Sequence, residues 1–265
     1  MNNYYFPFGQ KLTKVQQTET TPNKEVFVLG VYASAVHTKW LDNEGGIKVQ
    51  ALAVASEPEI FWKGEGVEKI IGKIDIPKEI GKLVPANKNL NGPSGVALDD
   101  LFLKPLGFSR NQAWLCDLLP ESRVNPNQQK AVKMYNDIAG QYGLPISTIP
   151  EFREDEIKEN AKQRHLEILN ELEKSGAKTI ILLGDLPIRW FLHFFDKRTK
   201  LSQFGNSQET YGQRHDILIN DKTYSVIPLC HPRNAARLGA FSKTWAELHD
   251  VWVEMKSDKI KNIYF

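Results

Sequence analysis

Uninterrupted runs of apolar residues constrain the fold of this 265-residue chain more than any other feature of its sequence. A strand that is covered on both faces is apolar at every position, whereas a half-exposed strand alternates. Segments with helical spacing of apolar residues separate these runs. The pattern predicts an α/β protein, a three-layer α/β/α sandwich with a central, mainly parallel four-stranded sheet. Its four buried strands are expected at residues 26–33, 113–120, 178–184 and 226–230.

Residues 25–256 are expected to form one domain, because no repeat, low-complexity tract or linker divides them. A polar extension at residues 1–24 precedes this domain, and a tail at residues 257–265 follows it. Residues 48–56 predict a further strand. Residues 57–91, with scattered Gly, Pro and Lys, predict loops over one edge of the fold.

The composition is that of a globular protein, with 41% hydrophobic and 25% charged residues. A net charge of +2 is too small to predict nucleic-acid binding by itself. The two cysteines, Cys116 and Cys230, lie in apolar runs and are too few for a zinc or iron–sulfur site, so neither a metal nor a cofactor is expected. No stretch approaches about 18 apolar residues, and no signal peptide is evident. We therefore expect a cytoplasmic monomer without a membrane partner.

A long amphipathic helix is predicted at residues 155–175, with a solvated, charged face. The residues expected to face inward follow helical spacing: Ile157, Ala161, Leu166, Leu169 and Leu172.

The stretch from Ser225 to Trp252 carries the strongest functional pattern. A buried strand ends at Cys230, His231 and Pro232 follow, and a basic loop leads into a helix. Open α/β sheets bind ligands beyond the carboxyl ends of their strands. His231 is therefore a candidate functional residue, and the alternative is that it caps or hydrogen-bonds a turn.

Asp117 is an acid inside a buried strand run. A buried carboxylate destabilises a fold unless it is paired or used. Asp117 is thus expected to contact a ligand at a strand end, or else to cap a helix or pair with Arg123. The sequence holds no dinucleotide-binding or phosphate-binding glycine loop, no GxSxG elbow and no HExxH pair, so these chemistries have no support.

Residues 91–126 (NGPSGVALDDLFLKPLGFSRNQAWLCDLLPESRVNP) resemble the middle of the uracil-DNA glycosylase superfamily, in the branch that normally carries an iron–sulfur cluster. There, a Gly-x-Ser-Gly turn opens a helix, and a strand ends in an asparagine before a loop rich in Arg and Pro. Residues 156–184 resemble the next helix and strand of that branch. Residues 226–238 (VIPLCHPRNAARL) are similar to the second motif, a His-Pro after a strand. Residues 26–34 lie where the first motif is expected, and the resemblance covers most of residues 26–252.

The resemblance implies a protein that flips a base out of DNA and hydrolyses its N-glycosidic bond. His231 and Asp117 are then the catalytic residues: His231 donates a hydrogen bond to the departing base, and Asp117 reads the base edge. The Trp62 or the Phe61 ring would stack on the base, and core packing is the alternative use of either ring. The implied base pocket consists of Gly30, Tyr32, Ala33, Ser34, Trp62 and Asp117. The implied DNA contacts are Ser94, Arg123, Arg233, Arg237 and Lys243, with Leu238 as a wedge into the vacated stack.

Three positions depart from the family pattern. Residues 30–34 contain no carboxylate or amide that could position water. Asp117 stands where the family has an asparagine. An ionised carboxylate only accepts hydrogen bonds, so Asp117 favours a base edge with N–H groups unless it is protonated. Asn160 stands where a cluster cysteine is expected, so no iron–sulfur cluster should form.

The leading hypothesis is a DNA base-excision glycosylase with divergent base choice. The alternatives are a catalytically inactive module of the same fold that binds nucleic acid or a base, and a hydrolase acting on small N-glycosides. The arginines after His231 favour DNA over a free nucleoside. Salt-dependent affinity for DNA separates the first two hypotheses from the third, and turnover separates the first from the second.

Overall fold

The chain divides into two units, each with its own sheet. The structure, a computed structural model, describes residues 4–17 and 23–264. Unit 1 contains the described residues of Met1–Val15, Tyr32–Pro93 and Pro120–Glu154. Unit 2 contains those of Gln16–Val31, Ser94–Leu119 and Asp155–Phe265. This division differs from the predicted single domain at residues 25–256.

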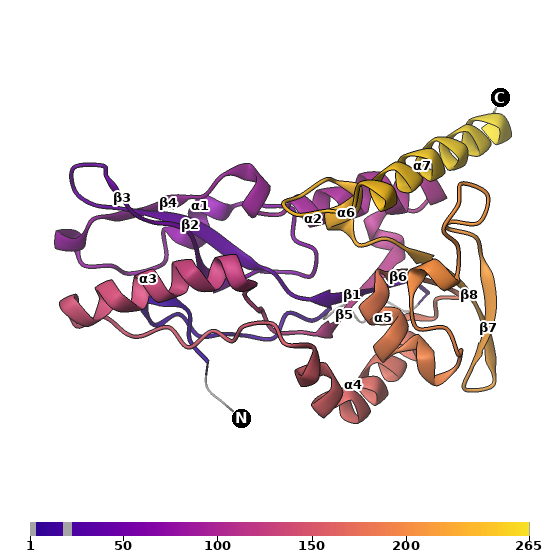
Figure 1. Ribbon diagram of the computed structural model, residues 1–265, viewed down its shortest axis with the longest axis horizontal. Helices are drawn as coiled ribbons and strands as arrows, with labels where there is room; N and C mark the ends of the chain where they lie inside the picture. Colours follow the sequence, from indigo (N-terminus) through magenta and orange to yellow (C-terminus); the bar gives the residue numbers. More distant parts are fainter. Residues whose placement is uncertain (1–3, 18–22, 265) are drawn as a thin grey trace. The chain divides into compact units, whose positions relative to one another are not determined.

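Unit 2 is built on a five-stranded, mostly parallel sheet that is flanked by helices (Figure 1). Its strands are β1 (Val26–Tyr32), β5 (Ala113–Leu119), β6 (Thr179–Leu183), β7 (His215–Ile219) and β8 (Lys222–Leu229), in the order β5-β1-β6-β8-β7. Strand β6 pairs in parallel with β1 and with β8, and β7 is antiparallel to β8. The predicted α/β class and mainly parallel sheet are confirmed.

The sheet has one strand more than the predicted four, because β7 was missed. This edge strand buries only Ile217 and Ile219, and its apolar run is limited to the three residues from Ile217 to Ile219. Asn220 and Asp221 have positive φ and form the tight turn into β8. The four predicted strands correspond to β1, β5, β6 and β8.

Unit 2 also contains five α-helices: α2 (Pro93–Ala97), which begins at the boundary residue, α4 (Glu154–Ser175), α5 (Asp185–Trp190), α6 (Pro232–Ala235) and α7 (Lys243–Tyr264). A π-helical turn spans Leu98–Leu103, and 3₁₀ turns span Lys104–Leu106, Arg110–Gln112, Leu192–Phe194 and Leu201–Gln203. Helix α7 runs through most of the predicted C-terminal tail and ends at Tyr264.

The inward face of α4 agrees with the predicted one at Ile157 and Leu172, which are buried, and differs from it at Leu166; the Ala161 side chain lies outside the described residues. Leu166 is 55% exposed, whereas Ile168 is 1% exposed. Arg164 also lies on the buried face, because its guanidinium group bonds to β5. A buried arginine has no apolar signature, so hydrophobic spacing alone placed this part of the helix in the wrong rotation.

Unit 1 contains a three-stranded antiparallel sheet in the order β3-β2-β4. The strands are β2 (Ala35–Leu41), β3 (Ile47–Ser56) and β4 (Lys82–Pro85), and the helices are α1 (Val67–Ile71) and α3 (Pro126–Tyr142) (Figure 1). Short 3₁₀ turns span Pro7–Gly9, Lys78–Ile80 and Lys88–Leu90. The strand predicted at residues 48–56 is confirmed as β3, but it belongs to this second sheet.

Unit 1 has an apolar core of its own. Trp40 and Tyr135 are fully buried in it, together with Leu52, Val54 and Trp62. The Trp40 and Tyr135 rings lie 5.8 Å apart, and the Trp40 indole nitrogen donates to the Ile80 carbonyl. This separate core is the physical reason for two units where the sequence predicted one domain.

Within residues 4–17 and 23–264, no helix combines the length and the apolar character that crossing a bilayer requires.

Candidate functional site

His231 lies at the carboxyl edge of the parallel strands of unit 2. It follows β8, and Gly184 follows β6, the strand beside it. The Gly184 amide donates to the Leu229 carbonyl at 2.8 Å, and a Cβ atom at Gly184 would lie 3.5 Å from the His231 Cβ. Gly184 has φ 93° and ψ −173°, a conformation that only glycine adopts without strain. The chain turn beside His231 therefore requires glycine.

The His231 ring is held in one tautomer. Its Nδ1 atom accepts a hydrogen bond from the Arg233 backbone N–H at 3.1 Å, which makes His231 the N-cap of α6. The half-buried position of the ring lowers its pKa to about 4, and the nearby positive charge of Arg233 lowers it further in the same direction. The ring is thus neutral at pH 7, and its single proton lies on Nε2.

The two interpretations of His231 are therefore compatible. Nδ1 caps a turn, as the alternative interpretation expected. Among the described residues, none accepts a hydrogen bond from Nε2. The Nε2–H group is a fixed donor at the sheet edge where ligands bind in this class of fold.

Asp117 lies inside β5 with 3% of its surface exposed, and its Oδ1 atom has no hydrogen-bond partner among the described residues. Burial raises its pKa to about 7; the Arg164 charge opposes this shift, and the Glu171 charge adds to it. A strand alternates its side chains between two faces. Because the neighbouring Cys116 sulfur contacts Arg164 of α4 at 3.1 Å, the Asp117 side chain points to the opposite face of the sheet.

Arg164 joins α4 to the strand that carries Asp117. Its Nη2 atom donates to the Asp117 carbonyl at 2.6 Å, and its Nη1 atom lies 3.1 Å and 3.0 Å from the carboxylates of Glu167 and Glu171. Glu171 also accepts from the Trp114 indole at 3.1 Å. This network holds the Asp117 carbonyl against α4, which sequence spacing did not reveal.

We expect Arg164→Met to lower the free energy of unfolding by about 3 kcal/mol, because it leaves the largely buried Glu171 carboxylate without its cation. Loss of the Arg164 charge should also raise the Asp117 pKa further. Denaturant unfolding and NMR titration of the carboxyl group measure these changes. Arg237→Met is the matched control. It breaks an exposed ion pair and should cost less than about 1 kcal/mol; equal losses would contradict a special role for Arg164.

The basic side chains that follow His231 have hydrogen-bond or ion-pair partners within unit 2. Arg233 is exposed, and its Nε atom donates to the Leu238 carbonyl at 3.1 Å. Arg237, at φ 53°, forms a two-point ion pair with Asp250, with Nη2–Oδ2 at 2.5 Å. Lys243 is exposed and lies 3.6 Å from Glu247, whereas Leu238 is half-buried. Exposed ion pairs of this kind are weak, so these cations can exchange partners with a phosphate.

The other candidate pocket residues divide between the units. Gly30 is buried within β1 of unit 2, whereas Tyr32, Ala33 and Ser34 lie in unit 1. The Tyr32 ring stacks on Phe152 at 4.9 Å, and the Ser34 carbonyl accepts from the Ser122 hydroxyl.

Trp62 is a core residue of unit 1. It is 2% exposed and belongs to the apolar cluster around Trp40, and its indole nitrogen donates to the Glu65 carbonyl at 3.0 Å. Trp62 thus packs in the core, which was the alternative to base stacking, because an indole enclosed by core side chains has no free face for a base.

Arg123 is also buried, at 5% exposure. Its Nη1 atom donates to the carbonyls of Glu121 and Ser122 at 3.2 Å and 3.0 Å. A guanidinium group used in this way is not an exposed phosphate contact, which corrects the implied role of Arg123. Ser94 is half-buried in the first turn of α2. The Asn160 side chain lies outside the described part of the chain, although its backbone lies in α4.

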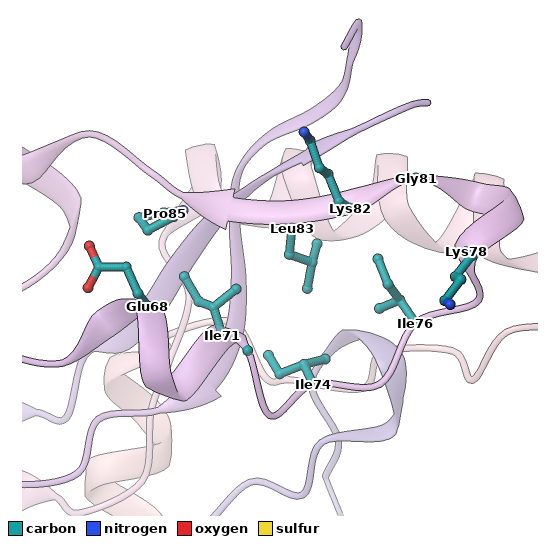
Figure 2. A pocket seen from close by; sticks show the side chains of 10 residues that line it. Glu68, Ile71, Ile74, Ile76, Lys78, Gly81, Lys82, Leu83 and Pro85 are labelled. Atoms are coloured by element: carbon teal, nitrogen blue, oxygen red, sulfur yellow. The ribbon is translucent and has the colours of Figure 1, made fainter. Parts of the chain in front are cut away.

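Unit 1 has a recess of about 430 Å³ beneath β4 (Figure 2). Its floor is apolar, formed by Ile71, Ile74, Ile76 and Leu83. Binding sites for small molecules need a few polar groups that converge on the ligand. Three charged residues, Glu68, Lys78 and Lys82, also line the recess, and in Figure 2 the Lys82 side chain points away from it, on the side of the strand opposite Leu83. None of the site residues predicted from the sequence lines this recess. We place the candidate site in unit 2.

Within the described ranges, no three His, Cys, Asp or Glu side chains are grouped as a metal site would require. Neither the protein-family models nor the curated proteins compared with this sequence match it. The two candidate residues follow from different strands of unit 2. His231 is a neutral donor after β8, and Asp117 is a buried carboxyl group in β5, which β1 and β6 separate from β8 in the strand order.

Proposed function

We propose that this protein excises a damaged or deaminated base from DNA by hydrolysing the N-glycosidic bond, as the resemblance to uracil-DNA glycosylases implies. The observation that carries the proposal is the His231 Nε2–H group, a neutral donor held at the sheet edge by its Nδ1 contact with Arg233. In the reaction the bond between the base nitrogen and the sugar C1′ breaks, and the base leaves with the electron pair. Water adds to C1′ and supplies the proton that the base takes up. A fixed donor at the base stabilises the negative charge that develops there.

Asp117 supports the same proposal as the group that reads the base. With its pKa near 7, a large fraction of the carboxyl groups is protonated at neutral pH. A protonated carboxyl group both donates and accepts, as an asparagine amide does, whereas the ionised form only accepts. The departure from asparagine at position 117 is thus compatible with an imide edge such as that of uracil at or below neutral pH.

The remaining parts of the proposal concern architecture and partner. Helices would cover both faces of the central sheet, giving the three layers typical of the family. Arg233, Arg237 and Lys243 would contact DNA phosphates, with Leu238 as the wedge into the base stack. The intramolecular partners of Arg237 and Lys243 are exposed, so a phosphate can displace them at low salt.

A strand-cleavage assay tests this function directly. The substrates are oligonucleotides that bear uracil, hypoxanthine, xanthine or a thymine mismatch, in single- and double-stranded form. We expect release of at least one base by the wild-type chain, retained in His193→Ala, which alters an exposed histidine of unit 2. No release from any substrate would overturn catalysis.

A catalytically inactive base- or nucleic-acid-binding module is the second candidate. It is favoured by residues 30–34, which hold no carboxylate or amide to position the attacking water. Salt-sensitive DNA binding without base release would support this module. Binding of nucleosides without affinity for DNA would instead support a small N-glycoside substrate.

A further inference from the structure

A buried chain of hydrogen bonds ends at the residue before His231. The His249 Nε2 atom lies 3.0 Å from the Leu101 carbonyl, and its Nδ1 atom lies 2.8 Å from the Tyr211 hydroxyl. The same hydroxyl accepts from the Cys230 backbone N–H at 2.9 Å. The Tyr211, His249 and Cys230 residues are each 1% exposed. All of these residues belong to unit 2.

The direction of each hydrogen bond follows from its partners. The Leu101 carbonyl can only accept, so His249 donates through Nε2. Burial lowers the His249 pKa to about 4, which keeps the ring neutral and leaves Nδ1 as an acceptor. The Tyr211 hydroxyl therefore donates to His249, and its oxygen accepts from Cys230. Each donor in this hydrogen-bond network therefore meets an acceptor.

The network holds one peptide group from both sides. The peptide between Leu229 and Cys230 offers one carbonyl and one N–H group. The carbonyl accepts from the Gly184 amide at 2.8 Å, and the N–H donates to Tyr211 at 2.9 Å. His231 is the next residue, and its ring is fixed by the Arg233 N–H. The peptide before His231 and the His231 ring are thus held in place by different hydrogen bonds.

We propose that Tyr211 and His249 are positioning residues that fix the direction in which the His231 Nε2–H group points. For its effect on catalysis this inference rests on the proposed function. A donor acts on a departing base only if it lies at the correct place before the reaction, and an error of about 1 Å can cost about 100-fold in rate.

The surrounding packing prevents the two residues from shifting. The Phe102 and Trp252 rings lie 4.3 Å and 5.1 Å from the His249 ring. The Trp252 indole donates at 3.2 Å to the carbonyl of Gly212, the residue after Tyr211. A Cβ atom at Gly212 would come within 2.3 Å of that indole nitrogen. Helix α7 is thereby tied to the loop that presents the tyrosine hydroxyl.

Tyr211→Phe is the primary test, and Tyr135→Phe is its matched control. The Tyr135 hydroxyl in unit 1 also accepts a backbone N–H, from Phe8 at 2.7 Å, and donates to a carbonyl, of Pro145 at 2.8 Å. Both variants lose the same kind of buried hydrogen bonds. We expect only Tyr211→Phe to lower the rate constant of base release, by about 10- to 100-fold, with KM nearly unchanged.

NMR titration of the His231 ring tests the positioning without any need for activity. In Tyr211→Phe the ring gains freedom, so we expect its titration midpoint to rise towards the ordinary histidine value near 6.5 and its Nε2 signal to shift. The Tyr135→Phe spectrum should match the wild type at His231. If the wild-type chain releases no base, the proposed function fails, and the titration alone decides the positioning role.

His249 supplies a second pair of variants, should Tyr211→Phe fail to fold. His249→Asn keeps an acceptor oxygen near the Nδ1 position and should retain most of the wild-type rate and the His231 titration. His249→Leu removes that acceptor and should match the expected behaviour of Tyr211→Phe. The inference is overturned if Tyr211→Phe behaves as Tyr135→Phe does, or if His249→Leu and His249→Asn both leave the His231 titration unchanged.

Discussion

His231→Ala should lower the rate constant of base release by about 10²- to 10³-fold, the usual cost of removing one fixed hydrogen-bond donor from a site of developing negative charge. The loss should fall on kcat rather than on KM, because the donor acts on charge that appears only in the transition state. Single-turnover kinetics on the best substrate of the base-release assay measure this effect.

Two further variants are compared with His231→Ala. His231→Gln retains an N–H donor near the Nε2 position and should recover part of the lost rate, whereas alanine cannot. The His193→Ala control alters another histidine of unit 2 and should leave the rate unchanged. Equal rates for His231→Ala and wild type would remove His231 from the mechanism, and a similar loss for His193→Ala would point to unfolding.

Asp117→Asn should stabilise the protein at pH 8 far more than at pH 4. The Asp117 pKa is raised from its ordinary value of 3.8 to about 7 in the folded chain. Between these values the folded state binds the proton and the unfolded state releases it, so wild-type stability falls as the pH rises from about 4 to about 7. A shift of about three pKa units corresponds to roughly 4 kcal/mol. Asparagine does not ionise, so this loss is absent from the variant.

Urea unfolding of both chains at pH 4 and pH 8 isolates the contribution of Asp117, because all other groups titrate alike in both proteins. Asp216→Asn, which removes an exposed carboxylate on β7, is the control; it keeps Asp117 and should lose stability between pH 4 and pH 8 as the wild-type chain does. If Asp117→Asn and wild type differ equally at both pH values, the folded-state pKa of Asp117 is not raised.

We expect the ionisation of Asp117 to change the rate at which uracil is released. Uracil release by the wild-type chain should fall as the pH rises above about 7, because the ionised carboxylate repels the uracil carbonyl. Asp117→Asn should release uracil at pH 8 at a rate close to its rate at pH 6. A wild-type pH profile that is flat across this range would separate Asp117 from base reading.

Sequence patterns located the central sheet well because burial leaves a direct trace in composition. Every residue of β5 and β6 is buried, and apart from Asp117 and Thr179 both strands consist of apolar residues. The same reasoning placed His231 directly after β8. It missed β7, where only three consecutive residues are apolar, and β2, whose His37 and Lys39 resemble a loop although His37 is 1% exposed.

Residue identity did not reveal which polar or aromatic side chains are enclosed. Trp62 and Arg123 suit a ligand site by type, but one packs in the unit 1 core and the other bonds to neighbouring carbonyls. Leu166 suits a core position by spacing, but Arg164 and Ile168 occupy that face of α4. The burial of Trp62 and of Arg164 depends on contacts between segments far apart in the chain, which local periodicity does not encode.

The sequence by itself determined the α/β class, the four long buried strands and the positions of His231 and Asp117 along them. Only the tertiary structure decided the chemical state of those two residues. The proton of His231 lies on Nε2 because Nδ1 meets the Arg233 amide, and the Asp117 pKa is near 7 because water is excluded around it. Protonation depends on desolvation and on charges such as that of Arg164, which folding brings from 47 residues away.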